Sequence, residues 1–223
     1  MKTQHHSGHL GKIVDLLQTR IRQWITPLDH VAQWIPDGDN ALELGCGQGI
    51  LIQKIAGRMQ KITGVDYDLR KCQLALEQFK DSPNITIIKG DILEYLHNTP
   101  AQLFDTIILA DTLASIRIEN QDTILEECYR IIQENGTIIL KIMDVTPRYK
   151  YKISLLVASL VYKVLRLSIS DGQRFYHRSS TILATKLQSL GFTTTIIPLH
   201  QIHYNPLSHT VVLGKKQTAL NKK

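Results

Sequence analysis

The sequence predicts an α/β protein with a doubly wound, mostly parallel sheet and helices on both faces. Three observations predict it. Short apolar stretches alternate along the chain with segments whose apolar residues recur at helical spacing. Acidic residues stand repeatedly where those stretches end, as is common at the ligand-binding edge of a parallel sheet. The 223 residues, 43% of them hydrophobic, suffice for a single domain, residues 1–223, with a full core.

The chain is expected to begin with helices. Residues 9–24 place apolar side chains at helical spacing, and the Thr-Pro pair that opens residues 26–34 is typical of a helix start. Residues 36–40, with proline, glycine and aspartates, predict a turn into the first strand. We therefore assign residues 1–35 to N-terminal helices that precede the sheet.

A glycine-rich turn follows the first strand, within residues 41–49, Ala-Leu-Glu-Leu-Gly-Cys-Gly-Gln-Gly. Its glycines allow backbone N–H groups to approach a ligand, and the helix expected from Ile50 presents its N-terminus there. The dinucleotide pattern Gly-x-Gly-x-x-Gly fails, because Ile50 occupies its third glycine position. Glu43 would repel a pyrophosphate and suits a cationic ligand instead.

Further strands end in acids. The second ends at Asp66, 17 positions after Gly49, where a carboxylate can accept hydrogen bonds from two ribose hydroxyls. The third ends at Asp91 and the fourth at Asp111. The expected strands after the first span residues 62–66, 85–91, 104–111, 136–142, 193–198 and 210–213, and the expected helices span residues 66–79, 123–133 and 179–190.

Glu-x-Gly-x-Gly-x-Gly followed by Asp66 and Asp91 resembles the class I S-adenosylmethionine-dependent methyltransferases, over about residues 36–143. The resemblance implies a Rossmann-like, seven-stranded sheet and S-adenosyl-L-methionine as cofactor. In that family the aspartate at the place of Asp91 lies beside the adenine amino group. The cofactor-binding residues that it implies are Glu43, Gly45, Cys46, Gly47, Gly49, Asp66, Tyr67, Asp91, Ile92 and Ala110. Cys46 is interpreted as a spacer in the turn, because no electropositive partner marks it as a nucleophile.

Charge divides the chain into two unlike parts. Residues 1–143 carry 14 Lys/Arg and 18 Asp/Glu, whereas residues 144–223 carry 12 Lys/Arg and 2 Asp/Glu. We assign residues 36–143 to the cofactor-binding core and residues 144–223 to a basic, substrate-side half. Such asymmetry indicates an anionic partner on the substrate side: a membrane surface, a small molecule or nucleic acid.

A basic amphipathic helix is expected within residues 149–170. Charge interrupts it too often for a membrane span. It is an interfacial helix on anionic lipid, a lid over an apolar substrate, or an ordinary helix whose apolar face packs on the core. Its apolar face comprises Ile153, Leu156, Val157, Leu160, Val161, Val164 and Leu165, and its polar face Lys152, Ser159, Lys163, Arg166 and Ser170.

Nucleic acid is less favoured as the partner. Aromatic residues make up 6% of the chain, whereas RNA-binding surfaces usually interleave exposed aromatic and basic side chains. Asp111 is followed by Thr-Leu-Ala, and not by the Pro-Pro-Tyr of exocyclic-amine methyltransferases. The unpaired spacing of three cysteines and the lack of a signal-peptide pattern favour the cytoplasm, with peripheral contact at a membrane surface as an option.

Methyl transfer from a sulfonium is an in-line displacement, and a base is needed when the nucleophile must lose a proton. His177, Tyr176 and Asp111 are the candidate catalytic residues. His177 could instead be a capping or packing histidine. No metal is expected, since no carboxylate or cysteine accompanies the histidines at 200, 203 and 209.

The sequence thus predicts a methyltransferase that acts on a small-molecule or lipid-like, anionic acceptor. Two alternatives remain. The first is an RNA methyltransferase whose basic half docks the RNA. The second is a non-catalytic protein that binds S-adenosylmethionine and is recruited to a membrane or a partner through its amphipathic helix.

Overall fold

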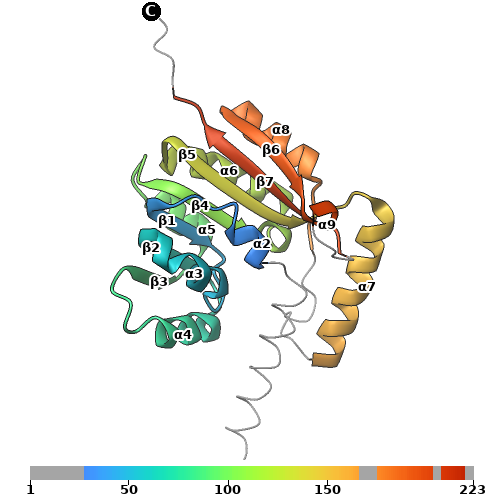
Figure 1. Ribbon diagram of the computed structural model, residues 1–223, viewed down its shortest axis with the longest axis horizontal. Helices are drawn as coiled ribbons and strands as arrows, with labels where there is room; N and C mark the ends of the chain where they lie inside the picture. Colours follow the sequence, from blue (N-terminus) through green and yellow to red (C-terminus); the bar gives the residue numbers. More distant parts are fainter. Residues whose placement is uncertain (1–27, 166–174, 203–206, 219–223) are drawn as a thin grey trace, which may run out of the picture.

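The computed structural model describes residues 28–165, 175–202 and 207–218 (Figure 1). The helix predicted at residues 9–24 lies outside this part of the chain. The strands are β1 (Gly38–Leu44), β2 (Met59–Asp66), β3 (Ile85–Lys89), β4 (Phe104–Ala110), β5 (Ile132–Met143), β6 (Phe192–Pro198) and β7 (His209–Lys216). The helices are α2 (Leu28–Ala32), α3 (Ile50–Ile55), α4 (Leu69–Gln78), α5 (Ile92–His97), α6 (Ile118–Ile131), α7 (Arg148–Leu165), α8 (Ser180–Leu190) and α9 (Leu199–Ile202), with 3-10 turns η1 (Ala56–Arg58) and η2 (Leu113–Ser115).

The seven strands form one sheet in the order β3-β2-β1-β4-β5-β7-β6. Strands β1 to β5 pair in parallel, and β7 runs antiparallel between β5 and β6. The predicted doubly wound, mostly parallel sheet is therefore confirmed. Strand order reverses between β1 and β4, and such a switch point opens a crevice at the carboxyl ends of the strands.

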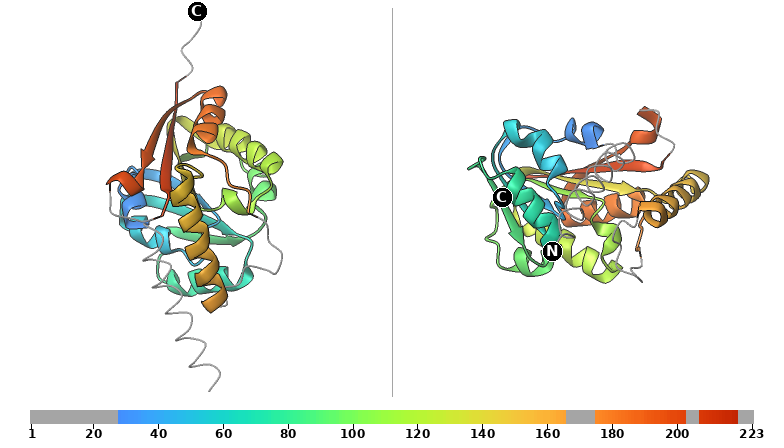
Figure 2. Two further views of the ribbon diagram at one scale, coloured as in Figure 1. Left: turned by 90° about the vertical axis from the view of Figure 1, so that its right-hand side faces the viewer. Right: turned by 90° about the horizontal axis from the view of Figure 1, so that it is seen from below.

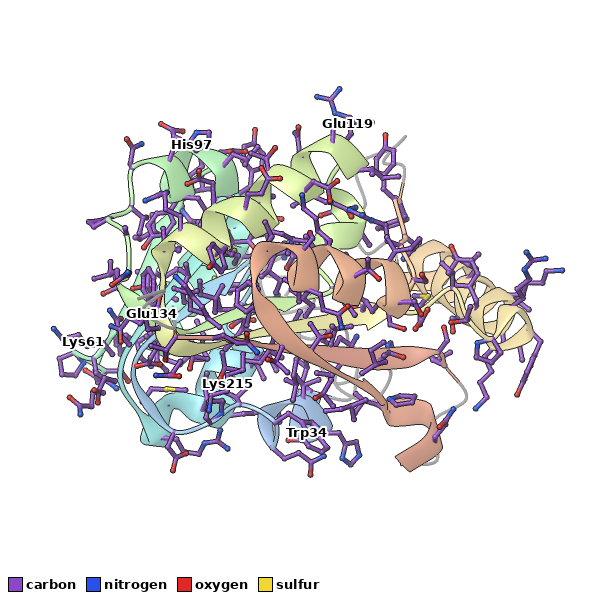
Figure 3. All side chains as sticks on the ribbon, turned by 90° about the horizontal axis from the view of Figure 1, so that it is seen from above. Trp34, Lys61, His97, Glu119, Glu134 and Lys215 are labelled. Carbon is purple, nitrogen blue, oxygen red and sulfur yellow. The ribbon has the colours of Figure 1, made fainter. Side chains whose placement is uncertain are left out.

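Helices cover both faces of the sheet (Figure 2). Apolar residues of α2, α3 and α4 form a core on one face, and those of α5, α6 and α8 form a core on the other. In Figure 3, the labelled His97 and Glu119 lie on one side of the sheet and Trp34 lies on the opposite side. The strands serve both cores because successive side chains alternate: in β4, Ile107 and Leu109 face one core and Ile108 the other.

Several predicted boundaries were wrong. Residues 38–40 belong to β1 and not to a turn, because the Asp105 carboxylate accepts the backbone N–H groups of Asp39 and Asn40, both at 2.7 Å. Strand β5 begins at Ile132, where the sequence predicts the end of a helix, since Ile132 pairs with Phe104 of β4. Helix α5 was not predicted. The short helix 28–32, and α8 with its Ser179 cap and Gly191 stop, agree with the prediction.

Helix α7 projects beyond the edge of the sheet (Figure 1). It is seated through a polar contact: Ser154 is fully buried, and its hydroxyl accepts the backbone N–H of Ser208 at 3.0 Å. Ile153 is 43% exposed and Leu156 is 70% exposed. Ile153 and Leu156 therefore do not pack on the core, and the side chains of the other five predicted apolar-face residues lie outside the described part. Residues 166–170 of the predicted helix lie outside the described part.

Candidate functional site

The glycine turn between β1 and α3 requires glycine at three alternate positions. Gly45, Gly47 and Gly49 have φ values of 77°, 56° and 77°, in the left-handed region that disfavours side chains. A Cβ on Gly45 would also lie 2.4 Å from Thr112 Oγ1. The Gly45 N–H donates to the carbonyl of Val65 at 2.7 Å, which holds the turn against the end of β2.

Asp66 braces the same turn from the end of β2. Its Oδ2 accepts the Gly47 N–H at 2.7 Å, and its Oδ1 accepts the Asp68 N–H at 2.8 Å. Each carboxylate oxygen has two lone pairs, so both retain acceptor capacity. Burial raises the pKa of the Cys46 thiol, and the charges of Glu43 and Asp66 raise it further. An inert thiol agrees with the interpretation of Cys46 as a spacer.

A first hollow opens at the switch point of the sheet. Four predicted cofactor residues line it together with Asp111, and Glu43 is almost fully buried there, at 3% exposure. Leu28 of α2 lines it as well, so this N-terminal helix borders the site. The residues lining the first hollow are Leu28, Glu43, Gly45, Cys46, Gln48, Ile50, Leu51, Ala110 and Asp111.

The remaining predicted cofactor residues lie along the same edge but do not line the first hollow. The Gly90 N–H donates to the Asp66 carbonyl at 3.0 Å, which brings the ends of β2 and β3 together. Asp91 caps α5 through hydrogen bonds from two backbone N–H groups to its Oδ1, and Ile92 is the first residue of that helix. Tyr67 is 74% exposed, with Lys89 over its ring.

The edge of the sheet fits the implied cofactor. The glycines leave open backbone where a Cβ would intrude, and the buried Glu43 carboxylate complements a cation. Carboxylates at the ends of β2 and β3 can accept hydrogen bonds from ribose hydroxyls and an exocyclic amine. S-adenosylmethionine carries all of these groups, together with a positive sulfonium.

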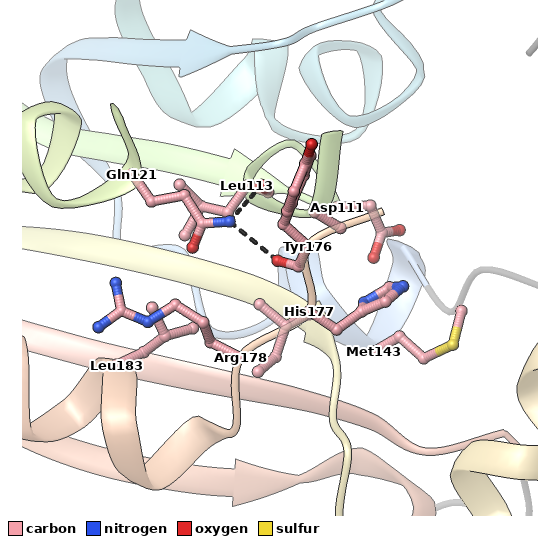
Figure 4. A pocket seen from close by; sticks show the side chains of 10 residues that line it. Asp111, Leu113, Gln121, Met143, Tyr176, His177, Arg178 and Leu183 are labelled. Atoms are coloured by element: carbon pink, nitrogen blue, oxygen red, sulfur yellow. Dashed lines mark hydrogen bonds between the residues drawn. The ribbon is translucent and has the colours of Figure 1, made fainter. Parts of the chain in front are cut away.

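A second hollow adjoins the first and shares Asp111 with it (Figure 4). The sequence-predicted catalytic residues His177, Tyr176 and Asp111 all line it. In Figure 4, the Asp111 carboxylate and the His177 ring lie at the same end of the second hollow. The residues lining the second hollow are Asp111, Leu113, Ala114, Gln121, Ile142, Met143, Tyr176, His177, Arg178 and Leu183.

His177 lies in an aromatic environment. The Tyr151 ring of α7 meets its imidazole edge-on at 5.5 Å between centroids, and the Phe175 ring stacks at 5.8 Å. Burial lowers the pKa of His177 below its ordinary value of 6.5, and the negative charge of Asp111 opposes this shift. The imidazole is therefore neutral at pH 7 and can accept a proton.

Two residues at or near the second hollow were not predicted from the sequence. Gln121 is buried, and its Nε2 donates to the carbonyl oxygens of Leu113, Ile116 and Tyr176 at 2.8 to 2.9 Å. It thus holds the segment that carries His177. No pattern marks Gln121, because its contacts span 55 residues of sequence. Lys141 is fully buried in β5 and forms an ion pair with Asp111. A lysine inside an apolar strand was a visible signal.

Among the described residues, no group of three or more histidine, cysteine, aspartate or glutamate side chains could hold a metal ion. His203 and the side chain of His200 lie outside that part of the chain. Within the same described ranges, no helix has the length and apolar character of a membrane span.

Comparisons with known proteins agree with this geometry. Residues 41–136 match the family model described as a methyltransferase domain. The chain is 24% identical, over 82% of its length and 76% of the relative's, to the ubiquinone biosynthesis O-methyltransferase of Dechloromonas aromatica. Its fold is similar to an Archaeoglobus fulgidus SAM-dependent methyltransferase, with a TM-score of 0.64, 16% identity and coverage of 91% and 94% of the two chains. It is also similar to the Synechocystis magnesium protoporphyrin IX methyltransferase with bound SAH, with a TM-score of 0.61, 16% identity and coverage of 86% and 82%.

The fold, the matched domain and the relatives define an enzyme of the transferase class that uses S-adenosylmethionine. The chain contains a methyltransferase domain and has the fold of the class I S-adenosylmethionine-dependent methyltransferases. This confirms the resemblance seen in the sequence, and it favours an enzyme over the non-catalytic alternative.

Replacing Asp66 by alanine is expected to weaken binding of S-adenosylhomocysteine about 10- to 50-fold, because a charged acceptor for the ribose and the brace on Gly47 are both lost. Calorimetric titration measures the affinity. Asp68→Ala is the matched control, because it removes the cap of α4 and an ion pair with Lys71 but leaves Asp66 in place. The control should lose about 1 kcal/mol of stability and keep its affinity. Equal affinity of Asp66→Ala and the wild type would contradict the ribose role.

Proposed function

We propose that this methyltransferase methylates a hydroxyl oxygen of a small, lipid-like, anionic acceptor, with His177 as the general base. The observation that carries the proposal is the second hollow: it adjoins the first and contains a half-buried imidazole that is neutral at pH 7. A hydroxyl nucleophile must lose its proton as the new bond forms, and a neutral imidazole can take it.

The residues divide the work as follows. S-adenosylmethionine, when bound, supplies an electrophilic methyl group on a sulfonium. Glu43 and Asp111 complement positive charge in the first hollow, and Asp66 holds the ribose. In the second hollow, Tyr176 and His177 orient the acceptor so that its oxygen lies in line with the methyl group. His177 would receive the proton that the hydroxyl loses as its oxygen takes the methyl group.

The remaining predicted cofactor residues are proposed to contact other parts of S-adenosylmethionine. Gly45 and Cys46 line the first hollow, and a Cβ on Gly45 would lie 2.4 Å from Thr112 Oγ1. Asp91 and Ile92, at the start of α5, are proposed to contact the adenine, with Tyr67 beside the ribose. The carbonyl end of β4 at Ala110 borders the methionine part of the cofactor. Asp91 keeps Oδ2 for this contact, because its cap on α5 uses Oδ1.

The acceptor class rests on charge and exposed apolar surface. Tyr149, Ile153 and Leu156 of α7 are 43% to 70% exposed, and they stand beside the exposed Lys152. Tyr151 of the same helix contacts His177, so α7 leads from this surface to the second hollow. An acceptor with an apolar tail and an anionic group would match both features. The relatives' name, which refers to ubiquinone biosynthesis, supports an apolar acceptor with a hydroxyl group.

Labelled S-adenosylmethionine incubated with the enzyme and a cell extract tests the acceptor class. The products are separated into lipid, small-molecule, RNA and protein fractions. We expect label in the lipid or small-molecule fraction, in a bond stable to the mild acid and base that cleave methyl esters. Label in the RNA fraction, removed by ribonuclease, would support the RNA alternative and overturn the proposal. Label in protein alone would overturn it as well.

We further propose that α7 contacts an anionic membrane surface. Replacing Ile153 and Leu156 together by glutamine is expected to weaken binding to phosphatidylglycerol vesicles at least about 10-fold, because each apolar side chain loses its transfer from water to lipid. Vesicle flotation measures the effect. Leu76→Gln on α4, a leucine that is 51% exposed, is the matched control and should bind like the wild type. Equal flotation of all three proteins would contradict the contact.

A further inference from the structure

Lys141 is a charged residue at a buried position of the sheet, where apolar residues are usual. It lies in β5 between Leu140 and Ile142, in a strand that packs against both cores. Its side chain has no exposed surface. A buried ammonium group is costly unless it is paired, and replacing such a pair by apolar side chains often leaves stability unchanged. The buried ion pair is therefore weak evidence that the fold itself requires a lysine at this position.

Asp111, the partner of Lys141, has a left-handed backbone conformation. Asp111 follows the last residue of β4 and has a φ of 61°, which residues other than glycine rarely adopt. Its backbone N–H donates to the Lys141 carbonyl at 2.8 Å, and its Oδ2 pairs with the Lys141 ammonium group. Backbone and side chain of Asp111 are thus held by the same residue.

Asp111 is also the residue that the first and second hollows share. Its carboxylate is 35% exposed, whereas Lys141 is covered completely. The ion pair therefore has one solvent-accessible end, directed to the reaction site, and one buried end within the sheet. This difference in solvent exposure is typical of a buried group that positions a carboxylate in a site, and not of a surface ion pair.

We propose that Lys141 is a positioning residue of the methyl-transfer site: its buried ammonium group holds the Asp111 carboxylate between the two hollows and offsets its charge beside His177. Lys141 itself touches neither hollow. It acts through Asp111, whose charge favours the imidazolium form of His177. By offsetting that charge, Lys141 favours the neutral imidazole that a general base requires. This inference rests on the proposed role of His177.

The other polar and charged groups around His177 are accounted for. Tyr151 faces it from α7, and burial raises the pKa of this tyrosine, so its phenol stays neutral. Arg178, the next residue, forms an ion pair with Asp122 of α6. Tyr176, on its other side, donates its backbone N–H to Ala114. Among the described residues, Lys141 with Asp111 is thus the pair whose disruption changes the charge facing the imidazole.

Titration of the His177 imidazole by NMR tests the proposal without a methyl acceptor. The ring signal is assigned by its loss in a His177→Gln protein. In Lys141→Met, the Asp111 charge is no longer offset, so the titration of His177 is expected to move to higher pH by about half a unit to one unit. Lys141→Gln, which retains a donor without charge, should move it in the same direction. Asp111→Asn should move it to lower pH.

The matched control is Lys216→Met. Lys216 is also a buried lysine, 5% exposed, and its ammonium group donates to the carbonyl oxygens of Tyr129 and Ile132, both at 3.0 Å, at the far end of β7. It should lose stability and leave the His177 titration unmoved. Unmoved titration in both Lys141 variants, or an equal shift in Lys216→Met, would overturn the proposal. The proposed function fails separately, when a folded His177→Gln enzyme keeps its full rate of methyl transfer.

Discussion

Replacing His177 by glutamine is expected to lower the rate of methyl transfer by about 100- to 10,000-fold, the usual contribution of a positioned general base. Glutamine can hydrogen-bond to the acceptor but cannot take its proton. The affinity for S-adenosylhomocysteine should stay within about 2-fold of the wild type, because His177 lines the second hollow and not the first. The rate is measured with labelled S-adenosylmethionine and the acceptor isolated from the active fraction.

The pH dependence of kcat/KM also tests His177 as the general base. A base works in its neutral form, so the wild-type rate is expected to fall as the pH drops through the pKa of His177. Burial lowers that pKa below 6.5, so the half-point of the decline should lie below pH 6.5. In His177→Gln this acid limb should disappear.

The control for this variant is His97→Gln. His97 is an exposed residue at the end of α5, away from both hollows, and its replacement should preserve the rate and the acid limb. A His177→Gln enzyme with more than about half of the wild-type rate would contradict the role of base. It would favour an acceptor that needs no deprotonation, and His177 would then pack Tyr151 and Phe175.

Replacing Gly45 by alanine is expected to destabilise the protein by about 2–5 kcal/mol and to weaken cofactor binding. The φ of 77° costs an alanine about 1–2 kcal/mol. The new Cβ would also lie 2.4 Å from Thr112 Oγ1, and overpacking of this kind typically costs about 1–3 kcal/mol. Thr112 cannot give way freely, since its hydroxyl donates to the Leu44 carbonyl at 2.7 Å.

Gly57→Ala is the matched control, because no atom lies within 4 Å of a Cβ at that position. It should be neutral or slightly stabilising, since alanine restricts the unfolded chain more than glycine does. Thermal unfolding and calorimetric titration of S-adenosylhomocysteine measure the two effects. Equal unfolding midpoints for Gly45→Ala and Gly57→Ala would show that the turn adapts, and the close contact with Thr112 would then be irrelevant to binding.

Much of the fold was predictable because its signals are local. Apolar runs with period two predicted the strands, and Ser179 with Gly191 predicted both ends of α8. The boundaries of β1 and β5 were not predictable in this way. Asp105 accepts N–H groups 65 and 66 residues away, and Ile132 joins the sheet only because Phe104 lies beside it. Such contacts override local propensity.

The candidate site divides along the same line. Glu43, the glycines and Asp66 were found from sequence because one tight turn requires them at fixed spacing. Gln121 and Lys141 were not, because their partners lie 55 and 30 residues away and no spacing rule connects them. The amphipathic pattern of α7 was also recognised, yet periodicity cannot say whether an apolar face meets the core or solvent.

By itself, the sequence determined the class of fold, the glycine turn and the acids at the strand ends, since each depends on neighbouring residues and on the geometry of parallel strands. Tertiary structure alone decided that Asp111 lines both hollows, that Lys141 pairs with it from inside the sheet, and that His177 lines the second hollow. These depend on which distant segments come within a few ångströms, and such proximity arises only when strand order and packing bring them together.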